Sequence, residues 1–451
     1  MSITIDYSRM VPAADPEKVK DYAGKIAAID ETLKNKRAAG DLPFYDLPYR
    51  NTADIEGYAA GIRGRFKNLV VLGIGGSALG LIALNSSLRS PYRDAVLDPE
   101  LYVLDNIDPE RLYRVMQKLD PAETLVNVIT KSGSTAETMA SFLIFRKWLI
   151  DGVGENGYRD RLVVTTARDS GSLRQIADKE GLVSFEVPEG VGGRFSVLTP
   201  VGLLPAALIG IDIKALLAGA AAMDKRLLNS TLLKNPAYLG AVMHYLAYLS
   251  GRCISVMFAY GDRLLDLADW YRQLWAESLG KRYDLNGIAV NVGPTPVKAL
   301  GVTDQHSQVQ LYKEGPDDKV YTFLKAENFE NTIEIPRAFE GNEAVFYLGG
   351  HTINELFNVE EMATEVALVK EKRPLTAISF SKVTPDEVGE FFYFFEVQTV
   401  AIGALFGIDP LDQPGVEEGK HFAYGLLGRS GFEDKKKEFA SFTTGDKALI
   451  F

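Results

Sequence analysis

The chain reads Leu69-Val70-Val71-Leu72-Gly73-Ile74-Gly75-Gly76-Ser77 at the point that decides its fold. The apolar run predicts a buried strand, and the glycines and the serine predict a turn that opens into a helix. A second apolar run, 124–129, continues in the same way as Thr130-Lys131-Ser132-Gly133-Ser134-Thr135. Helix N-termini expose unpaired N–H groups and the positive end of the helix dipole, and glycine lets an anion approach them. Two such loops at one sheet edge predict a site for a small phosphorylated molecule.

The order of apolar and amphipathic stretches predicts an α/β protein with parallel sheets between helices. Strands are expected at 69–72, 101–104, 125–129, 162–166 and 183–187, and a second set at 254–260, 288–292, 320–324 and 375–380. The expected organisation is an N-terminal helical segment (1–46), a first α/β domain (47–220), a helical connection (221–250), a second α/β domain (251–430) and a C-terminal tail (431–451).

Composition excludes several classes of protein. The 451 residues are 46% hydrophobic, which is enough for a large core, and the net charge of −11 argues against nucleic-acid binding. No signal sequence or membrane span is expected, so the expected location is the cytoplasm. Cys253 is the only cysteine; it lies beside an apolar strand and is expected to be buried.

Four further motifs carry groups suited to catalysis. Gly192-Gly193-Arg194 would hold a guanidinium at a backbone that only glycine permits, where it could stabilise an oxyanion. Glu277 falls at the edge of an apolar helical stripe, a position that suits a general base. His306 lies in Asp304-Gln305-His306-Ser307-Gln308, and Gln413 and Lys420 lie in a Pro/Gly turn and the segment after it. Taken singly, each has an ordinary alternative: a salt-bridged arginine, a solvated helix-end glutamate, a structural histidine and a charged surface loop.

Two other functions remain open on the residues alone. Gly73-Ile74-Gly75-Gly76-Ser77-Ala78 also fits a dinucleotide fingerprint, with Asp105 as the acid that would bind the ribose of a nicotinamide cofactor. The second hydroxyl-rich loop favours a phosphate monoester, because a dinucleotide site does not need it. The other alternative is a sugar-phosphate sensor without catalysis. The histidine and cysteine spacing does not predict a zinc site.

Taken together, the motifs resemble the phosphoglucose isomerase family in its shorter bacterial form. The resemblance extends from about Phe44 to Gly428, with the motifs in the family's order. The most specific stretches are 189–202, with its G-G-R-F-S core, and 403–420, with D-Q-P-G-V-E-x-x-K. Two positions depart from the family pattern: Thr130 stands where serine is usual, which keeps the hydroxyl, and Leu411 stands where Phe or Tyr is expected.

The resemblance implies two sugar-isomerase (SIS) domains, each a five-stranded parallel sheet between helices, in a homodimer that needs no cofactor or metal. It implies interconversion of glucose 6-phosphate and fructose 6-phosphate. Glu277 matches the base that moves a proton between C2 and C1, and Arg194 matches the group that stabilises the enediolate. His306, which in the family comes from the partner subunit, and Lys420 match the groups that assist ring opening. The matched substrate-binding residues are Gly76, Ser77, Thr130, Lys131, Ser132, Thr135, Gly193 and Gln413.

Overall fold

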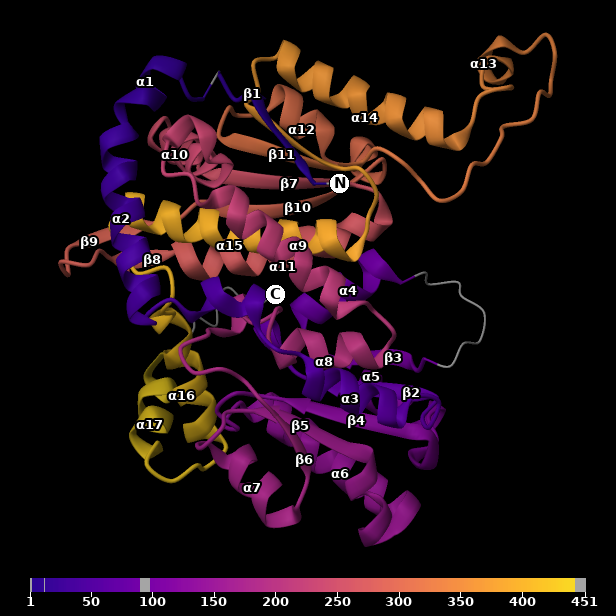
Figure 1. Ribbon diagram of the computed structural model, residues 1–451, viewed down its shortest axis with the longest axis vertical. Helices are drawn as coiled ribbons and strands as arrows, with labels where there is room; N and C mark the ends of the chain where they lie inside the picture. The colour runs from indigo at the N-terminus through magenta and orange to yellow at the C-terminus, as the bar shows by residue number, and fades with distance from the viewer. Residues whose placement is uncertain (1, 12, 90–97, 443–451) are drawn as a thin grey trace, which may run out of the picture. The chain divides into compact units, whose positions relative to one another are not determined.

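The computed structural model describes residues 2–11, 13–89 and 98–442 (Figure 1). Their contacts divide the chain into two compact units, Met1–Pro410 and Leu411–Phe451. The first unit holds both large sheets, and the second holds Gln413 and Lys420. The expected domain boundaries within the chain stay a prediction.

The first sheet is fully parallel, in the order β3-β2-β4-β5-β6. All five strands predicted for it occur within one residue at either end: β2 (Asn68–Leu72), β3 (Glu100–Leu104), β4 (Thr124–Ile129), β5 (Leu162–Thr166) and β6 (Val183–Glu186). Val70, Val126 and Val164 of neighbouring strands pack in one core cluster with apolar residues of α6 (Ala136–Gly157). Because β2 and β4 are neighbours, the loops that follow them emerge at the same edge of the sheet.

The second sheet has the order β1-β12-β11-β7-β10. Its parallel strands are β12 (Leu375–Phe380), β11 (Lys319–Ala326), β7 (Ile254–Tyr260) and β10 (Thr295–Gly301). The remaining strand, β1 (Thr4–Arg9), comes from the segment expected to be helical and pairs antiparallel with β12. The predicted α/β class with parallel sheets is therefore confirmed, with one antiparallel edge strand that the sequence analysis did not foresee.

The structure corrects two expectations in the second half of the chain. Residues 288–292 do not enter the large sheet: β9 (Ala289–Val292) pairs with β8 (Lys281–Tyr283) in a separate two-stranded sheet. The strand of the large sheet is β10, which was missed because Pro296 and Lys298 interrupt its apolar pattern; an edge strand, paired on one side only, tolerates both. Cys253 is exposed rather than buried, because it lies before the first residue of β7.

Long helices cover the sheets and join them. The longest apolar one, α15 (Pro385–Phe406), lies beside α9 (Ile213–Leu227) (Figure 1). Their approach needs glycine, since an added Cβ at Gly389 would lie 1.9 Å from the Leu216 carbonyl oxygen. By length and composition α15 could cross a membrane, but 94% of its most apolar window is buried in the protein, as in a core helix.

Further helices lie in the described part of the chain. They are α1 (Pro16–Asp21), α2 (Ala23–Ala39), α3 (Ala53–Ile62), α4 (Leu79–Leu88), α5 (Pro109–Lys118), α7 (Ser172–Glu180), α8 (Pro200–Leu208), α10 (Pro236–Leu249), α11 (Asp262–Leu279), α12 (Val309–Glu314), α13 (Glu343–Phe346), α14 (Ile353–Lys370), α16 (Glu417–Leu426) and α17 (Glu433–Phe442). Three short 3₁₀ turns carry predicted site residues: η2 (Gly75–Ser77), η5 (Gly193–Phe195) and η7 (Thr303–His306). In the C-terminal unit, α17 packs on α16 through Phe422 and Phe439.

Candidate active site

The first glycine-rich loop packs directly against the Gly192–Arg194 segment. A Cβ added at Gly76 would lie 2.2 Å from the carbonyl carbon of Gly193, so the two backbones approach more closely than any side chain would allow. Ser196 Oγ ties the pair together by donating to the carbonyl oxygens of Gly193 (2.6 Å) and Gly76 (3.3 Å). The structure thus brings Gly76 and Gly193 together, with Ser77 at the end of the same turn.

The second loop follows β4 and is closed by its own hydroxyls. Thr130 Oγ1 accepts from the Gly133 N–H (3.3 Å) and lies 3.3 Å from Thr135 Oγ1, while Ser132 Oγ lies 2.8 Å from Ser134 Oγ. Lys131 Nζ donates to the Val191 carbonyl oxygen (3.1 Å), which links this loop to the segment that carries Arg194. The predicted phosphate-binding residues therefore sit on two loops at one sheet edge, both joined to the same third segment.

Arg194 and Glu277 form the charged pair of the site. Arg194 Nη1 lies 3.4 Å from Glu277 Oε2, and the arginine side chain is 1% exposed while that of the glutamate is 33% exposed. Glu277 lies in the last turn of α11, whose apolar stripe places one side of the carboxylate against the core. A partly exposed carboxylate beside a buried cation can exchange a proton with a bound molecule while the cation faces the charge that develops on it.

Two residues that the sequence analysis did not single out contact this pair. Gln273 Nε2 donates to Glu277 Oε1 (3.1 Å), and an added Cβ at Gly75 would lie 3.0 Å from that same nitrogen. Ser278 Oγ accepts from Arg194 Nε (2.7 Å). Helical spacing could have revealed the contact of Gln273, because this residue precedes Glu277 by four positions and therefore shares its face of α11. Gln273 thus lies between the first loop and the carboxylate.

His306 lies apart from this cluster. Its side chain is exposed at the end of η7, and within the described residues it makes no hydrogen bond or ion pair. The turn itself is well held: Asp304 accepts from the Leu300 N–H (2.7 Å), and Gln305 bonds Tyr260 Oη (3.0 Å) and Glu360 (2.9 Å). The structure therefore holds the histidine backbone in place and shows no hydrogen bond between its ring and Glu277 within the described residues.

The remaining predicted residues belong to the C-terminal unit. Gln413 begins the 3₁₀ turn Pro414–Val416, and Lys420 lies on α16, where its Nζ pairs with Glu417 (2.7 Å). Asp105, the acid of the dinucleotide alternative, pairs with Arg111 (2.7 Å). Among the residues that the structure describes, no group of three or more His, Cys, Asp or Glu side chains is placed to hold a metal ion.

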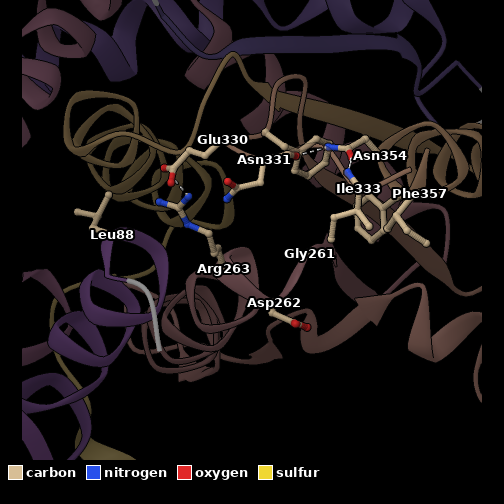
Figure 2. A pocket seen from close by; sticks show the side chains of 11 residues that line it. Leu88, Gly261, Asp262, Arg263, Glu330, Asn331, Ile333, Asn354 and Phe357 are labelled. Carbon is tan, nitrogen blue, oxygen red and sulfur yellow. Dashed lines mark hydrogen bonds and ion pairs between the residues drawn. The ribbon is translucent and has the colours of Figure 1, made fainter. Parts of the chain in front are cut away.

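A separate cavity of about 460 Å³ lies at the N-terminal end of α11 (Figure 2). Figure 2 shows Arg263 pointing toward Glu330, with Ile333 and Phe357 on the other side of the cavity. The arginine is already bound there, to Glu330 (3.1 Å) and to the carbonyl oxygens of Ser87 and Val383. None of the predicted site residues lines this cavity.

The two sheets, the hydroxyl loops and the carboxylate–guanidinium pair define an α/β protein of the sugar-isomerase (SIS) class. The model of the family described as "Phosphoglucose isomerase" matches residues 51–450. The chain is 46% identical to a glucose-6-phosphate isomerase of Carboxydothermus hydrogenoformans, with 97% of each chain covered, and 48% identical to one of Rubrobacter xylanophilus, with 81% and 83% covered. The chain therefore belongs to the phosphoglucose isomerase family.

Solved structures agree on the fold. A hypothetical protein from Thermus thermophilus superposes with a TM-score of 0.85 at 37% identity, covering 94% of this chain and 100% of that one. A glucose-6-phosphate isomerase from Chlamydia trachomatis superposes with a TM-score of 0.84, covering 98% of this chain and 91% of that one. At 21% identity, this similarity supports the fold alone.

Proposed function

We propose that the chain catalyses the reversible aldose–ketose isomerisation of glucose 6-phosphate and fructose 6-phosphate, a step of glycolysis and gluconeogenesis. The two relatives at 46% and 48% identity carry the name of this activity. The single structural observation that supports it most is Arg194 Nη1 at 3.4 Å from the partly exposed carboxylate of Glu277, beside the Gly76–Gly193 contact.

The proposed chemistry uses one carboxylate and one cation. Glu277 removes the proton from C2 of the open-chain aldose, and the C1 carbonyl oxygen takes up the electron pair as an enediolate. The proton of the C2 hydroxyl passes to the C1 oxygen, so the C2 carbonyl forms as the same carboxylate returns its proton to C1. Arg194 faces the developing negative charge, where a buried donor is most effective. His306 and Lys420 are proposed to assist ring opening, and Gln413 to contact the substrate. The reaction as proposed needs no redox cofactor and no metal, because C2 is oxidised as C1 is reduced within the same molecule.

The phosphate is proposed to bind at the two loops, through Ser77, Thr130, Ser132 and Thr135 and the Lys131 backbone. Support comes from the positions of these residues at the ends of neighbouring strands and from the links of both loops to the Arg194 segment. A phosphate held there acts as a remote handle, since its binding energy positions C1 and C2 against Glu277.

Direct turnover tests the function. Purified protein with EDTA and without nucleotide should convert glucose 6-phosphate to an equilibrium mixture with fructose 6-phosphate, followed by NMR so that no coupling enzyme is needed. Binding of the sugar phosphate without conversion would instead indicate a sensor, and binding of NAD or NADP with hydride transfer would indicate a dehydrogenase. Either result would overturn the proposal.

We also propose that two copies of the chain share each active site, because the ring of His306 is exposed and makes no hydrogen bond or ion pair with the described residues around Glu277. Glu277→Gln and His306→Ala variants, each inactive alone, should then regain about one quarter of wild-type activity when mixed, since a hybrid dimer holds one complete site. Subunit exchange is verified first with differently tagged chains. Hybrids that form but stay inactive would place the histidine in the site of its own subunit.

A cytoplasmic location is proposed from the substrates, which are intermediates of glycolysis. After cell lysis and centrifugation, the activity should remain in the supernatant. Activity that sediments with membranes and needs detergent for release would contradict this location.

A further inference from the structure

The guanidinium of Arg194 is held by neutral oxygen atoms as well as by Glu277. Nε donates to Ser278 Oγ at 2.7 Å and Nη2 donates to the Pro410 carbonyl oxygen at 2.6 Å, whereas Nη1 lies 3.4 Å from Glu277 Oε2. Of these three contacts, the two short ones are made to uncharged acceptors, and the contact to the carboxylate is the longest. This ordering is the reverse of an arginine that binds a carboxylate by two parallel short bonds.

Ser278 is placed to impose this arrangement. It is fully buried, whereas the neighbouring Glu277 is one-third exposed, so the last turn of α11 directs a hydroxyl inward and a carboxylate outward. Successive helical residues are separated by about 100° around the axis, which fixes the angle between the two side chains. One rigid turn therefore supplies both the base and the acceptor that orients the cation.

We infer that Ser278 is a positioning residue: it holds Arg194 by Nε so that the guanidinium faces the substrate and does not collapse onto Glu277. The inference rests on the proposed function. Without the hydroxyl, Nε loses its acceptor in a buried site, and the Glu277 carboxylate, 3.4 Å from Nη1, is a charge toward which the guanidinium can shift. A close Arg194–Glu277 pair would tie up the base and withdraw the cation from the developing oxyanion.

The test compares Ser278→Ala with Ser255→Ala. Ser255 is a matched control, because it is also buried and its Oγ bonds Tyr271 of the same helix (2.8 Å), away from Arg194. We expect Ser278→Ala to lower kcat by about tenfold or more, the effect of one hydrogen bond to a charged group, with KM changed less than about twofold. Ser255→Ala should lower the melting temperature but leave kcat within about twofold of wild type. If Ser278→Ala fails to fold, Ser278→Cys keeps the volume and provides only a weak acceptor.

A double-mutant cycle separates positioning from a general structural effect. If Ser278 acts through Arg194, then adding Ser278→Ala to an Arg194→Lys variant should change kcat less than about twofold, because lysine has no Nε donor to orient. Equal effects in both backgrounds, or a wild-type kcat in Ser278→Ala, would overturn the inference. Failure of the proposed function would look different, since the wild-type protein itself would not isomerise glucose 6-phosphate.

Discussion

The Glu277→Gln variant is expected to lose about 10²–10⁴-fold in kcat, with little change in the affinity for either sugar phosphate. The amide keeps the shape of the side chain but has no lone pair basic enough to take the C2 proton. The amide oxygen of the variant can still accept from Arg194, and Gln273 can turn its own amide so that its oxygen accepts from the new NH2 group, so the fold should be retained. The measurements are steady-state kinetics in both directions and a thermal unfolding curve.

Isotope exchange makes this expectation specific to the proton transfer. In deuterated solvent, wild-type protein should exchange the C2 proton of glucose 6-phosphate, and Glu277→Gln should lose that exchange in parallel with turnover. Open-chain substrate analogues should not rescue the variant, because ring opening is a separate step. Glu155→Gln, an exposed glutamate on α6, is the matched control and should behave as wild type. Near-normal exchange in Glu277→Gln would remove Glu277 from the mechanism.

The strands that are buried on both faces left the least ambiguity in the sequence, although the outer strands β3 and β6 of the first sheet were also predicted. β4 and β12 are fully buried along their length, and their unbroken apolar runs leave one interpretation. β1 and β10 are the outer strands of the second sheet, and their mixed composition meets no such constraint. The position of a strand at an edge depends on pairing over hundreds of residues, as β1 with β12 shows, and no local pattern encodes it.

For the candidate site, the motifs named the residues that are expected to act, but they did not predict which of them contact one another. The approach of Gly76 to Gly193 explains the glycines of two motifs that are distant in sequence, and it became visible only in the structure. Gln273 and Ser278 lacked a motif of their own, because an amide and a hydroxyl within a helix have many ordinary interpretations. The ring of His306 is exposed, so its role in the site stays a prediction that a single chain does not test.

The double variant Ser132→Ala/Thr135→Ala is expected to lower kcat/KM by roughly 10²–10⁴-fold, almost entirely through a higher KM. Each hydroxyl is proposed to donate one hydrogen bond to the phosphate dianion, and each such bond to a charged group contributes about 1.5–3 kcal/mol. The phosphate does not react, so these bonds are equally strong in the ground state and the transition state, and their loss should leave kcat nearly unchanged. The loop keeps the bond from the Gly133 N–H to Thr130 Oγ1 (3.3 Å) but loses the contacts of Ser132 with Ser134 and of Thr135 with Thr130, so a thermal unfolding curve accompanies the kinetics.

Inorganic phosphate distinguishes this site from other parts of the substrate pocket. Inorganic phosphate should inhibit competitively, and its inhibition constant should rise in the double variant by a factor comparable to the rise in KM. The reason is that phosphate contacts the same two hydroxyls but none of the residues that bind the sugar. Ser184→Ala is the matched control, because that hydroxyl lies on the same sheet and bonds Arg174 (2.8 Å) instead. A double variant whose KM and phosphate inhibition both stay at wild-type values would show that the phosphate binds elsewhere. A large fall in kcat with an unchanged KM would instead mean that the loop contacts the reacting carbons, so the substrate would have to lie in the reverse orientation, with its phosphate away from β4.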